Sequence, residues 1–222
     1  MSAFPFACVG LDLDGTLLDT AGDLTAAANH ALAWLGRAPL PVERLRPMIG
    51  GGARQLLARA MAATGGEERL DDGLKRLLAF YGANIAVHTR PFPQLIEALD
   101  GLGARGVTLA VCTNKREAFT DTLLRHFGLR DRFACVIGGD TLGPDTGKPK
   151  PDMLLAMAER CGAPAAFVGD SSYDVRAAHA AGLPAIACSF GYRDGPVEAL
   201  GADAVIDGFG ELLPALERLR PA

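Results

Sequence analysis

The sequence predicts an α/β fold in which a parallel sheet is covered by helices on both faces. Short apolar runs alternate with segments of helical periodicity along most of the 222 residues. Apolar residues make up 49% of the chain and charged residues 22%, which is the composition of a globular protein. Strands separated by helices pair in parallel through right-handed crossovers and are buried on both faces. A chain of this length needs no disulfide to fold.

Short apolar runs predict the strands of this sheet. They are Phe6–Leu13, Val107–Cys112, Cys135–Gly138, Ala166–Gly169, Ala185–Ser189 and Ala204–Ile206. Amphipathic segments between the later runs predict helices over Arg116–Phe127, Pro151–Cys161, Tyr173–Ala181 and Gly210–Leu219. Gly128, Gly162 and Gly182 follow three of these segments, where glycine commonly ends a helix.

One stretch interrupts the alternation and predicts a helical insert. Between the first strand and Val107 no run has the pattern of a strand. Helical periodicity appears instead over Gly22–Gly36, Ala53–Thr64 and Glu67–His88. We therefore expect residues 18–89 to form a helical domain inserted after the first strand. Residues 1–17 and 90–222 then form the α/β core.

Charge and cysteine usage exclude several classes of protein. The net charge is −4, and the arginines are scattered, whereas a nucleic-acid-binding protein usually carries a basic stripe. The five cysteines form no C-x-x-C pair, which predicts free thiols in a reducing compartment. The sequence has neither a basic signal segment nor an apolar run of about 18 residues. We expect a cytoplasmic protein that binds neither nucleic acid nor membrane.

Two acidic clusters follow apolar strands. The first is Asp12-Leu13-Asp14-Gly15-Thr16, where carboxylates two residues apart on a strand point to the same side and Gly15 permits a sharp turn. The second is Gly169-Asp170-Ser171-Ser172-Tyr173-Asp174. Each alone could be a turn or a helix cap. Together they bring carboxylates to the carboxyl edge of one sheet, which predicts a site for Mg²⁺, with Mn²⁺ as an alternative.

Two further loops bring polar groups to the same edge. Thr113 and Asn114 offer a hydroxyl, an amide and free backbone N–H groups at a strand-to-helix turn, which is a phosphate-binding arrangement. Taken alone, a turn with a helix cap is the simpler interpretation. Lys148 lies in Gly147-Lys148-Pro149-Lys150-Pro151-Asp152, where two prolines stiffen the loop. A loop lysine is usually solvated, but this one would be the fixed cation of the site besides the metal.

These motifs together resemble those of the haloacid-dehalogenase-like hydrolases. The order D-x-D-G-T, T-N, K-P-x-P-D and G-D-S-x-x-D covers the whole chain, with a helical cap of the C1 type after the first motif. The resemblance implies a Rossmann-like core. D-T-x-x-D-L, I-G-G-G-A near residue 50, P-F-P and F-G-Y-R near residue 190 are similar to bacterial phosphoglycolate phosphatases. That subgroup often has G-N-G where this chain has Gly50-Gly51-Gly52.

The resemblance also implies a reaction: Mg²⁺-dependent hydrolysis of a small phosphomonoester, foremost 2-phosphoglycolate, through an aspartyl-phosphate. Asp12 would be the nucleophile, and Asp14 would protonate the leaving oxygen and then activate water. The metal would bind the Asp12 carboxylate, the Asp14 carbonyl and Asp170. Gly15, Thr113 and Asn114 would bind the phosphoryl group, and Lys148 would neutralise its charge. Asp174 would support Lys148 or a metal-bound water. Gly51 and Arg54 of the cap would contact the substrate.

Other functions stay open at this point. A sugar-phosphate phosphatase, a pyrophosphatase or a phosphomutase would use the same motifs, and a non-catalytic phosphate-binding module is a remote alternative. Asp14 argues against a dehalogenase, because dehalogenases lack an acid at that position. A phosphonatase needs a Schiff-base lysine in the cap, whereas Lys75 is expected at the surface. The protein could be a monomer or a homodimer.

Overall fold

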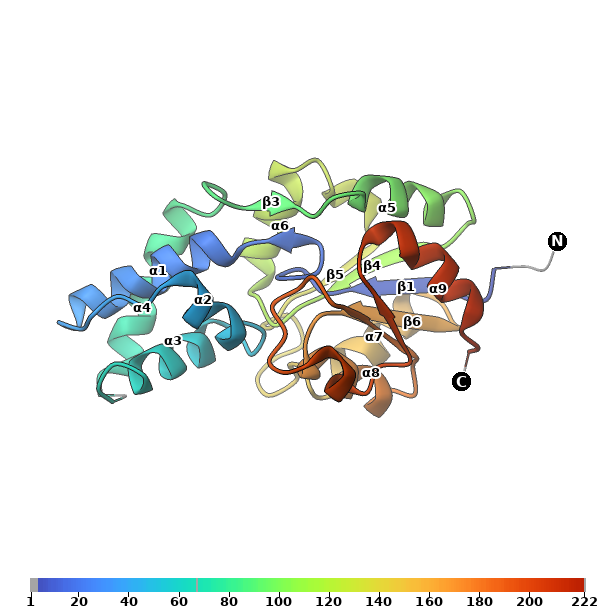
Figure 1. The fold of residues 1–222 in the computed structure, drawn as a ribbon. Helices are drawn as coiled ribbons and strands as arrows, with labels where there is room; N and C mark the ends of the chain where they lie inside the picture. Colours follow the sequence, from blue (N-terminus) through green and yellow to red (C-terminus); the bar gives the residue numbers. More distant parts are fainter. Residues whose placement is uncertain (1–3, 67, 222) are drawn as a thin grey trace.

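A six-stranded parallel sheet forms the centre of the computed structural model, which describes residues 4–66 and 68–221 (Figure 1). The strand order is β5-β4-β1-β6-β7-β8. The strands are β1 (Cys8–Leu11), β4 (Thr108–Cys112), β5 (Cys135–Ile137), β6 (Ala165–Gly169), β7 (Ala185–Cys188) and β8 (Ala204–Ile206). The α/β, Rossmann-like fold that the sequence predicts is confirmed.

The strands β1, β4, β5, β6 and β7 contribute alternate side chains to two separate hydrophobic cores. Val9 and Leu11 of β1 belong to one core, and Cys8 belongs to the other. The first core is closed by α5 (Leu95–Gly103), α6 (Glu117–His126) and α9 (Leu212–Arg218). The second is closed by α7 (Asp152–Cys161) and α8 (Ser172–Ala180), on the opposite face of the sheet (Figure 1). This two-residue period explains why the strands are short, nearly continuous apolar runs.

The register of β1 brings the predicted motifs together. Leu11 pairs with Val111 of β4 on one side and with Val168 of β6 on the other. The residues that follow these three strands therefore leave the sheet at one edge. This edge is also where the chain changes direction across the sheet, since β4 and β5 lie on one side of β1 and β6 to β8 on the other. Open α/β sheets bind ligands at such a point.

A helical unit lies beside the carboxyl ends of the strands (Figure 1). It contains α1 (Ala21–Trp34), α2 (Val42–Leu45), α3 (Ala53–Ala62) and α4 (Leu70–Ala83). Its helices pack around a third hydrophobic cluster that includes Leu32, Leu57 and Leu77. Gly73 permits the close approach of α4, because a Cβ there would lie 3.1 Å from both Leu35 and Leu57 side chains.

The structure corrects several sequence-based boundaries. The strand expected over Phe6–Leu13 covers only Cys8–Leu11, because the chain turns after Leu11 and Gly15 N–H bonds to the carbonyl of Leu18. The helix expected over Glu67–His88 ends at Ala83, where the Asn84 side chain binds the carbonyl of Phe80. Glu67 itself lies outside the described residues.

Two strands and two α-helices were not expected from the sequence. The strands β2 (Leu18–Asp19) and β3 (Arg90–Pro91) form an antiparallel ribbon where no strand was predicted. Two residues are too few to show a period, and only the tertiary structure pairs them. The helix α2, with four residues, is also too short to show a helical period. By contrast, α5 carries buried leucines at 95, 99 and 102, so its helical spacing was present in the sequence.

Short 3₁₀ helices complete the described chain. They are η1 (Arg46–Met48), η2 (Arg130–Arg132), η3 (Val197–Leu200) and η4 (Phe209–Glu211). The last of these precedes α9, so the helix expected from Gly210 begins as a tighter turn and becomes α-helical at Leu212.

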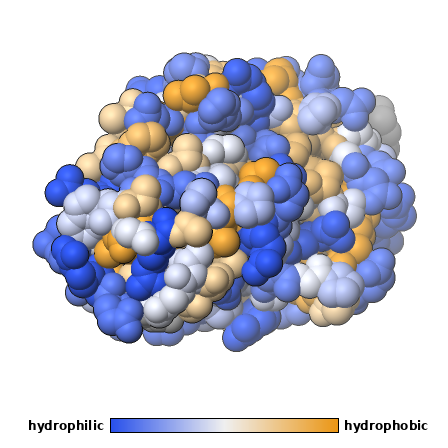
Figure 2. Space-filling view, turned by 60° about the vertical axis from the view of Figure 1, so that its left-hand side comes forward, coloured by the Kyte–Doolittle hydropathy of each residue, from blue (hydrophilic) through white to orange (hydrophobic). Residues whose placement is uncertain are grey.

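The surface is mainly hydrophilic. Figure 2 shows hydrophobic residues scattered among polar ones on the face that carries the helical unit. The exposed large hydrophobic residues come from separate elements and include Trp34, Val87 and Leu155. The five cysteines, all in the part of the chain that the structure describes, carry free thiols as predicted. Among residues 4–66 and 68–221, no helix has the length and apolar character to cross a membrane.

A buried carboxylate joins the helical unit to the returning chain. Asp23, in the first turn of α1, is 3% exposed. Its oxygens accept hydrogen bonds from the backbone N–H groups of His88 and Thr89 and from the Thr89 hydroxyl, at 2.7–3.1 Å. One side chain therefore satisfies the polar groups of the segment that leads back to β3.

Replacement of Asp23 by alanine is expected to lower the free energy of unfolding by about 3 kcal/mol, because it leaves these buried donors without an acceptor. Urea denaturation monitored by circular dichroism measures this change. Asp131→Ala, at an exposed position in η2, is the matched control and should change stability by less than about 0.5 kcal/mol. Equal effects of the two substitutions would contradict the role given to Asp23.

Candidate active site

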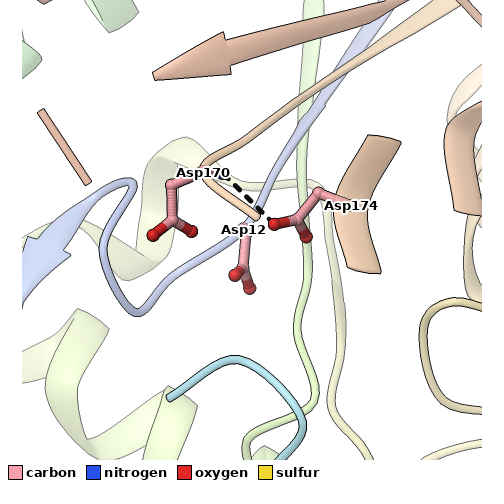
Figure 3. A group of neighbouring side chains, drawn as sticks. All are labelled: Asp12, Asp170 and Asp174. Carbon is pink, nitrogen blue, oxygen red and sulfur yellow. Dashed lines mark hydrogen bonds between the residues drawn. The ribbon is translucent and has the colours of Figure 1, made fainter. Parts of the chain in front are cut away.

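Three buried carboxylates meet at the carboxyl edge of the sheet (Figure 3). Asp12 follows β1, Asp170 follows β6, and Asp174 lies in the first turn of α8. One oxygen from each lies within 4.8 Å of the others. The second acidic cluster predicted from the sequence therefore reaches the first. The Asp14 carboxylate is not part of this group, although Asp12 and Asp14 both line the cavity described below.

Lys148 is the cation that these carboxylates share. Its side chain is 0% exposed, and Nζ lies 2.9 Å from Asp12 Oδ1 and 2.6 Å from Asp174 Oδ1. Nζ also donates a hydrogen bond to the carbonyl oxygen of Cys112 at 2.8 Å. The loop with two prolines thus places the ammonium group at the carboxyl ends of β1 and β4, in contact with Asp12.

Burial and charge set the protonation of this cluster. Burial raises the pKa of Asp12, Lys148 opposes that effect, and the net result is a pKa of about 6. Burial also raises the pKa of Asp170 well above its usual value, with further contributions from Asp174 and Asp12. Burial lowers the pKa of Lys148, but the charges of Asp12 and Asp174 outweigh it and raise the pKa overall. The lysine therefore stays charged, whereas ionisation of Asp12 and Asp170 is unfavourable without further positive charge.

Asp174 has a structural role in addition to its contact with Lys148. Its Oδ2 accepts hydrogen bonds from the Ser171 and Asp170 N–H groups and from the Ser171 hydroxyl, at 2.6–3.1 Å. Ser171 and Asp174 form a capping box at the start of α8. The helix-cap interpretation of this motif thus holds for Asp174. The cap turns Oδ1 toward Lys148.

Two glycines allow the chain to approach Asp170 closely. Gly15 has a φ of +84°, and a Cβ there would lie 2.2 Å from Asp170 Oδ2. A Cβ on Gly191 would lie 2.2 Å from Asp170 Cβ. The neighbouring Tyr192 N–H donates to Asp170 Oδ2 at 2.6 Å. Gly15 in the first motif and Gly191 in the loop after β7 therefore both pack against the Asp170 side chain.

The Asp14 carboxylate lies in a second group of residues, which the sequence analysis did not identify. Both of its oxygens lie 2.9 Å from Lys115 Nζ, and Oδ1 accepts a hydrogen bond from the Thr20 hydroxyl at 2.6 Å. Burial lowers the pKa of Lys115, but the charge of Asp14 outweighs it and raises the pKa overall. Lys115 was visible in the sequence as the residue directly after Thr113-Asn114. Nothing in the sequence indicated that its side chain would be buried against Asp14.

A cavity of about 550 Å³ opens beside these groups. Its polar lining includes Asp12, Asp14, Thr113, Asn114 and Lys115, and its apolar lining comes largely from the helical unit. The Asn114 amide donates to the carbonyl oxygens of Gly50 and Lys148, both at 2.9 Å, and thereby joins the helical unit to the sheet edge.

The predicted cap residues Gly51 and Arg54 also line this cavity. Arg54, however, has a 60% exposed side chain, and its guanidinium lies 2.5 Å from Asp71. Lys75 is exposed on α4 and is not among the residues that line the cavity, as the sequence analysis expected. The helical unit therefore contributes mainly apolar side chains to the cavity lining, together with Arg54, whose ion-pair partner Asp71 lies outside the lining.

The donor set fits a hard divalent cation. Three buried carboxylates share one buried ammonium group, so the cluster lacks positive charge when all are ionised. Among the described residues, Asp12 Oδ1 accepts no hydrogen bond of regular geometry although it is buried. Carboxylate oxygens are the ligands that Mg²⁺ prefers. The cluster can therefore hold a metal ion.

Known proteins with similar sequences and folds point the same way. The family model for haloacid dehalogenase-like hydrolases matches residues 6–182. The chain is 41% identical over 211 residues to a phosphoglycolate phosphatase of Agrobacterium fabrum (strain C58), an alignment covering 92% of this chain and 90% of that protein. It is 42% identical over 209 residues to a phosphoglycolate phosphatase of Caulobacter vibrioides, covering 91% and 87%. The crystal structure of a predicted phosphoglycolate phosphatase from Haemophilus somnus superposes with a TM-score of 0.88 at 30% identity, covering 95% of this chain and 97% of that chain.

The charge of the carboxylate cluster predicts that Asp12→Asn stabilises the metal-free protein. The pKa of Asp12 is about 6 in the folded chain against an ordinary value of 3.8. Its ionisation therefore opposes folding increasingly as the pH rises between these two values, and fully above the higher one. At pH 8 with a chelator, Asp12→Asn should raise the melting temperature by about 3 °C, corresponding to about 1 kcal/mol. At pH 3.5 the carboxyl is protonated in both states and the gain should disappear.

Thermal unfolding by calorimetry measures this difference, with Asp131→Asn as the exposed control. Mg²⁺ should reverse the order, because the wild-type protein keeps the full set of carboxylates. A melting temperature that is unchanged or lower for Asp12→Asn in the chelator would contradict the electrostatic argument.

Proposed function

The chain belongs to the haloacid dehalogenase-like hydrolase family, and we propose that it is a Mg²⁺-dependent phosphatase that converts 2-phosphoglycolate to glycolate and phosphate. The observation that carries this proposal is the buried Asp12 carboxylate, held 2.9 Å from Lys148 at the wall of a cavity that Asp14 also lines. The phosphoglycolate phosphatases that share about two fifths of its residues along most of the chain support the substrate.

In the first half of the reaction, Asp12 attacks the phosphorus atom in line with the ester oxygen. A bond forms between a carboxylate oxygen of Asp12 and phosphorus, and the bond from phosphorus to the ester oxygen breaks. Asp14 donates a proton to that oxygen, so the product leaves as glycolate rather than as an alkoxide. Thr113 and the N–H groups that follow it hold the phosphoryl oxygens. Lys148 offsets the charge of Asp12 and of the transferring group.

In the second half, the same residues hydrolyse the aspartyl-phosphate. Asp14, now deprotonated, takes a proton from a water molecule that attacks phosphorus. The bond to Asp12 breaks, phosphate leaves, and both carboxyl groups return to their starting state. Lys115 and Thr20 hold the Asp14 carboxylate at the cavity wall, which supports its position for both proton transfers.

Asp12, Asp170 and the backbone carbonyl of Asp14 would hold Mg²⁺, and Asp174 would orient Lys148 or a water molecule on the metal. When bound, the metal neutralises negative charge on the phosphoryl oxygens and on the carboxylates. The carboxylate donor set supports this assignment, as does Asp12 Oδ1, which accepts no hydrogen bond of regular geometry from the described residues. Mn²⁺ also accepts oxygen ligands and would serve as a substitute.

We further propose that residues 18–89 act as a cap over residues 1–17 and 90–222. The helical unit supplies most of the apolar lining of the cavity, which supports a role in excluding water from the reacting atoms. Gly51 leaves room for the Gln55 side chain, since a Cβ there would lie 1.5 Å from Gln55 Oε1. Arg54, at an exposed position of the lining, would attract the anionic substrate toward the opening.

Phosphate release across a panel of esters tests the activity. With Mg²⁺, 2-phosphoglycolate should exceed hexose and pentose phosphates, a nucleoside monophosphate and pyrophosphate in kcat/KM by about tenfold or more. Asp12→Asn should release no phosphate, and a chelator should abolish activity that Mg²⁺ then restores. A flat profile would overturn the substrate and keep the chemistry. Isomer interconversion with little phosphate release would indicate a mutase. No release from any ester would overturn the activity.

Arg54→Ala tests the contribution of the exposed cap charge. Because exposed charges act at long range and are screened, the variant should raise KM for 2-phosphoglycolate by only about threefold at low salt, with kcat unchanged. The effect should shrink in about 0.5 M salt. Steady-state kinetics at two ionic strengths provide the measurement. A KM that does not change at low salt would remove Arg54 from the substrate-binding residues.

A further inference from the structure

We propose that Lys115 and Tyr81 form a subsite for a carboxylate on the leaving group of the substrate. The proposal rests on the proposed function, since it assumes that the ester is cleaved between Asp12 and Asp14. It deepens that function by assigning the residues that select an acidic substrate. Neither residue was identified from the sequence, and both line the cavity.

Lys115 is a buried cation with donor capacity to spare. Its side chain is 5% exposed, and Nζ lies 2.9 Å from each oxygen of Asp14. An ammonium group has three N–H donors, and these two contacts use two of them. The third can turn either to the neighbouring Tyr81 side chain or to a ligand in the cavity, where the nearby cap lining is largely apolar.

Tyr81 supplies a second unused donor. It lies in α4 and is 2% exposed, and among the described residues its hydroxyl has no hydrogen-bond partner. Lys115 Nζ lies 4.6 Å from the centre of the Tyr81 ring, so the two groups are neighbours. Burial raises the pKa of Tyr81 to about 12, although Lys115 opposes that effect, so the hydroxyl keeps its proton. A buried hydroxyl without a partner is costly unless a ligand accepts its hydrogen bond.

The two donors match the needs of a carboxylate. An anion that enters an apolar cavity must be paired with a cation and must have its oxygens hydrogen-bonded. The Lys115 ammonium supplies the charge and one hydrogen bond, and the Tyr81 hydroxyl supplies another. The other cationic residues in the lining are Arg54, which is exposed and paired with Asp71, and Arg116, which is exposed.

The distance to Asp14 favours a short acid. In 2-phosphoglycolate one methylene separates the ester oxygen from the carboxylate carbon, a span of about 2.4 Å. Asp14 would lie about 2.7 Å from the ester oxygen in order to donate its proton. Because Lys115 is 2.9 Å from the same carboxylate, an acid one methylene from the ester oxygen lies within reach of Nζ. A longer acid would carry its carboxylate past this position.

The test compares 2-phosphoglycolate with ethyl phosphate, which has a methyl group in place of the carboxylate. Lys115→Met should lower kcat/KM for both esters, because Lys115 also holds Asp14, but the loss for 2-phosphoglycolate should exceed the loss for ethyl phosphate by about tenfold. Tyr81→Phe should raise KM for 2-phosphoglycolate by about fivefold and leave ethyl phosphate unchanged. Lys75→Met, at an exposed position of the same helix as Tyr81, is the control and should change neither substrate.

Equal losses for both substrates in Lys115→Met would overturn the proposal, because Lys115 would then act only by holding Asp14. If Lys115→Met does not fold, Tyr81→Phe decides. It removes only a buried hydroxyl without a partner among the described residues, so its melting temperature should be unchanged or higher. An unchanged KM for 2-phosphoglycolate would overturn the subsite.

Calorimetric binding to the Asp12→Asn protein separates this proposal from the proposed function. There 2-phosphoglycolate should bind at least tenfold more tightly than ethyl phosphate, and adding Lys115→Met should remove that preference. If the Asp12→Asn protein shows this preference but the wild-type protein hydrolyses no ester, the subsite is retained and the proposed activity is overturned. If the wild-type protein hydrolyses both esters and prefers neither in rate or in binding, the proposed activity is retained and the subsite is overturned.

Discussion

The contact between Lys148 and the carboxylates of Asp12 and Asp174 is the interaction on which the site depends. It brings together three segments that are far apart in the sequence, the turn after β1, the loop before α7 and the first turn of α8. A buried ammonium group with no partner would be strongly unfavourable, and so would three buried carboxylates with no cation. Each therefore requires the other. One lysine does not balance all three acids, and the remaining negative charge is what suits the cluster to a divalent cation.

The parallel sheet makes this arrangement possible. Neighbouring parallel strands end at the same edge of the sheet, so the turn after β1 lies next to the turn after β6. The helix α8 then begins at Ser171, and its capping residue Asp174 is turned toward the same point. A residue that caps a helix and also binds Lys148 serves folding and chemistry through the same carboxylate.

The helical unit adds what the sheet edge lacks. The edge is polar, and it would be open to water if the unit did not contribute an apolar lining to the cavity. The Asn114 amide, which spans from Gly50 to Lys148, and the buried Asp23, which binds the chain returning at Thr89, hold the unit in register with the sheet. In this arrangement Tyr81 of the unit meets Lys115 of the core, so the part of the cavity that would contact the leaving group is built from both.

The sequence by itself determined the order of the core strands along the chain, the helical character of the insert, and the acidic motifs at Asp12 and Asp170. These features depend on local periodicity and on residues a few positions apart, which the chain carries wherever it folds. The ribbon of β2 and β3, the contact of the Asp14 carboxylate with Lys115, and the burial of Lys115 against Tyr81 were decided only by the tertiary structure. Each pairs segments tens of residues apart, and a side chain's partner at that range depends on how the helical unit packs on the sheet, which no local pattern encodes.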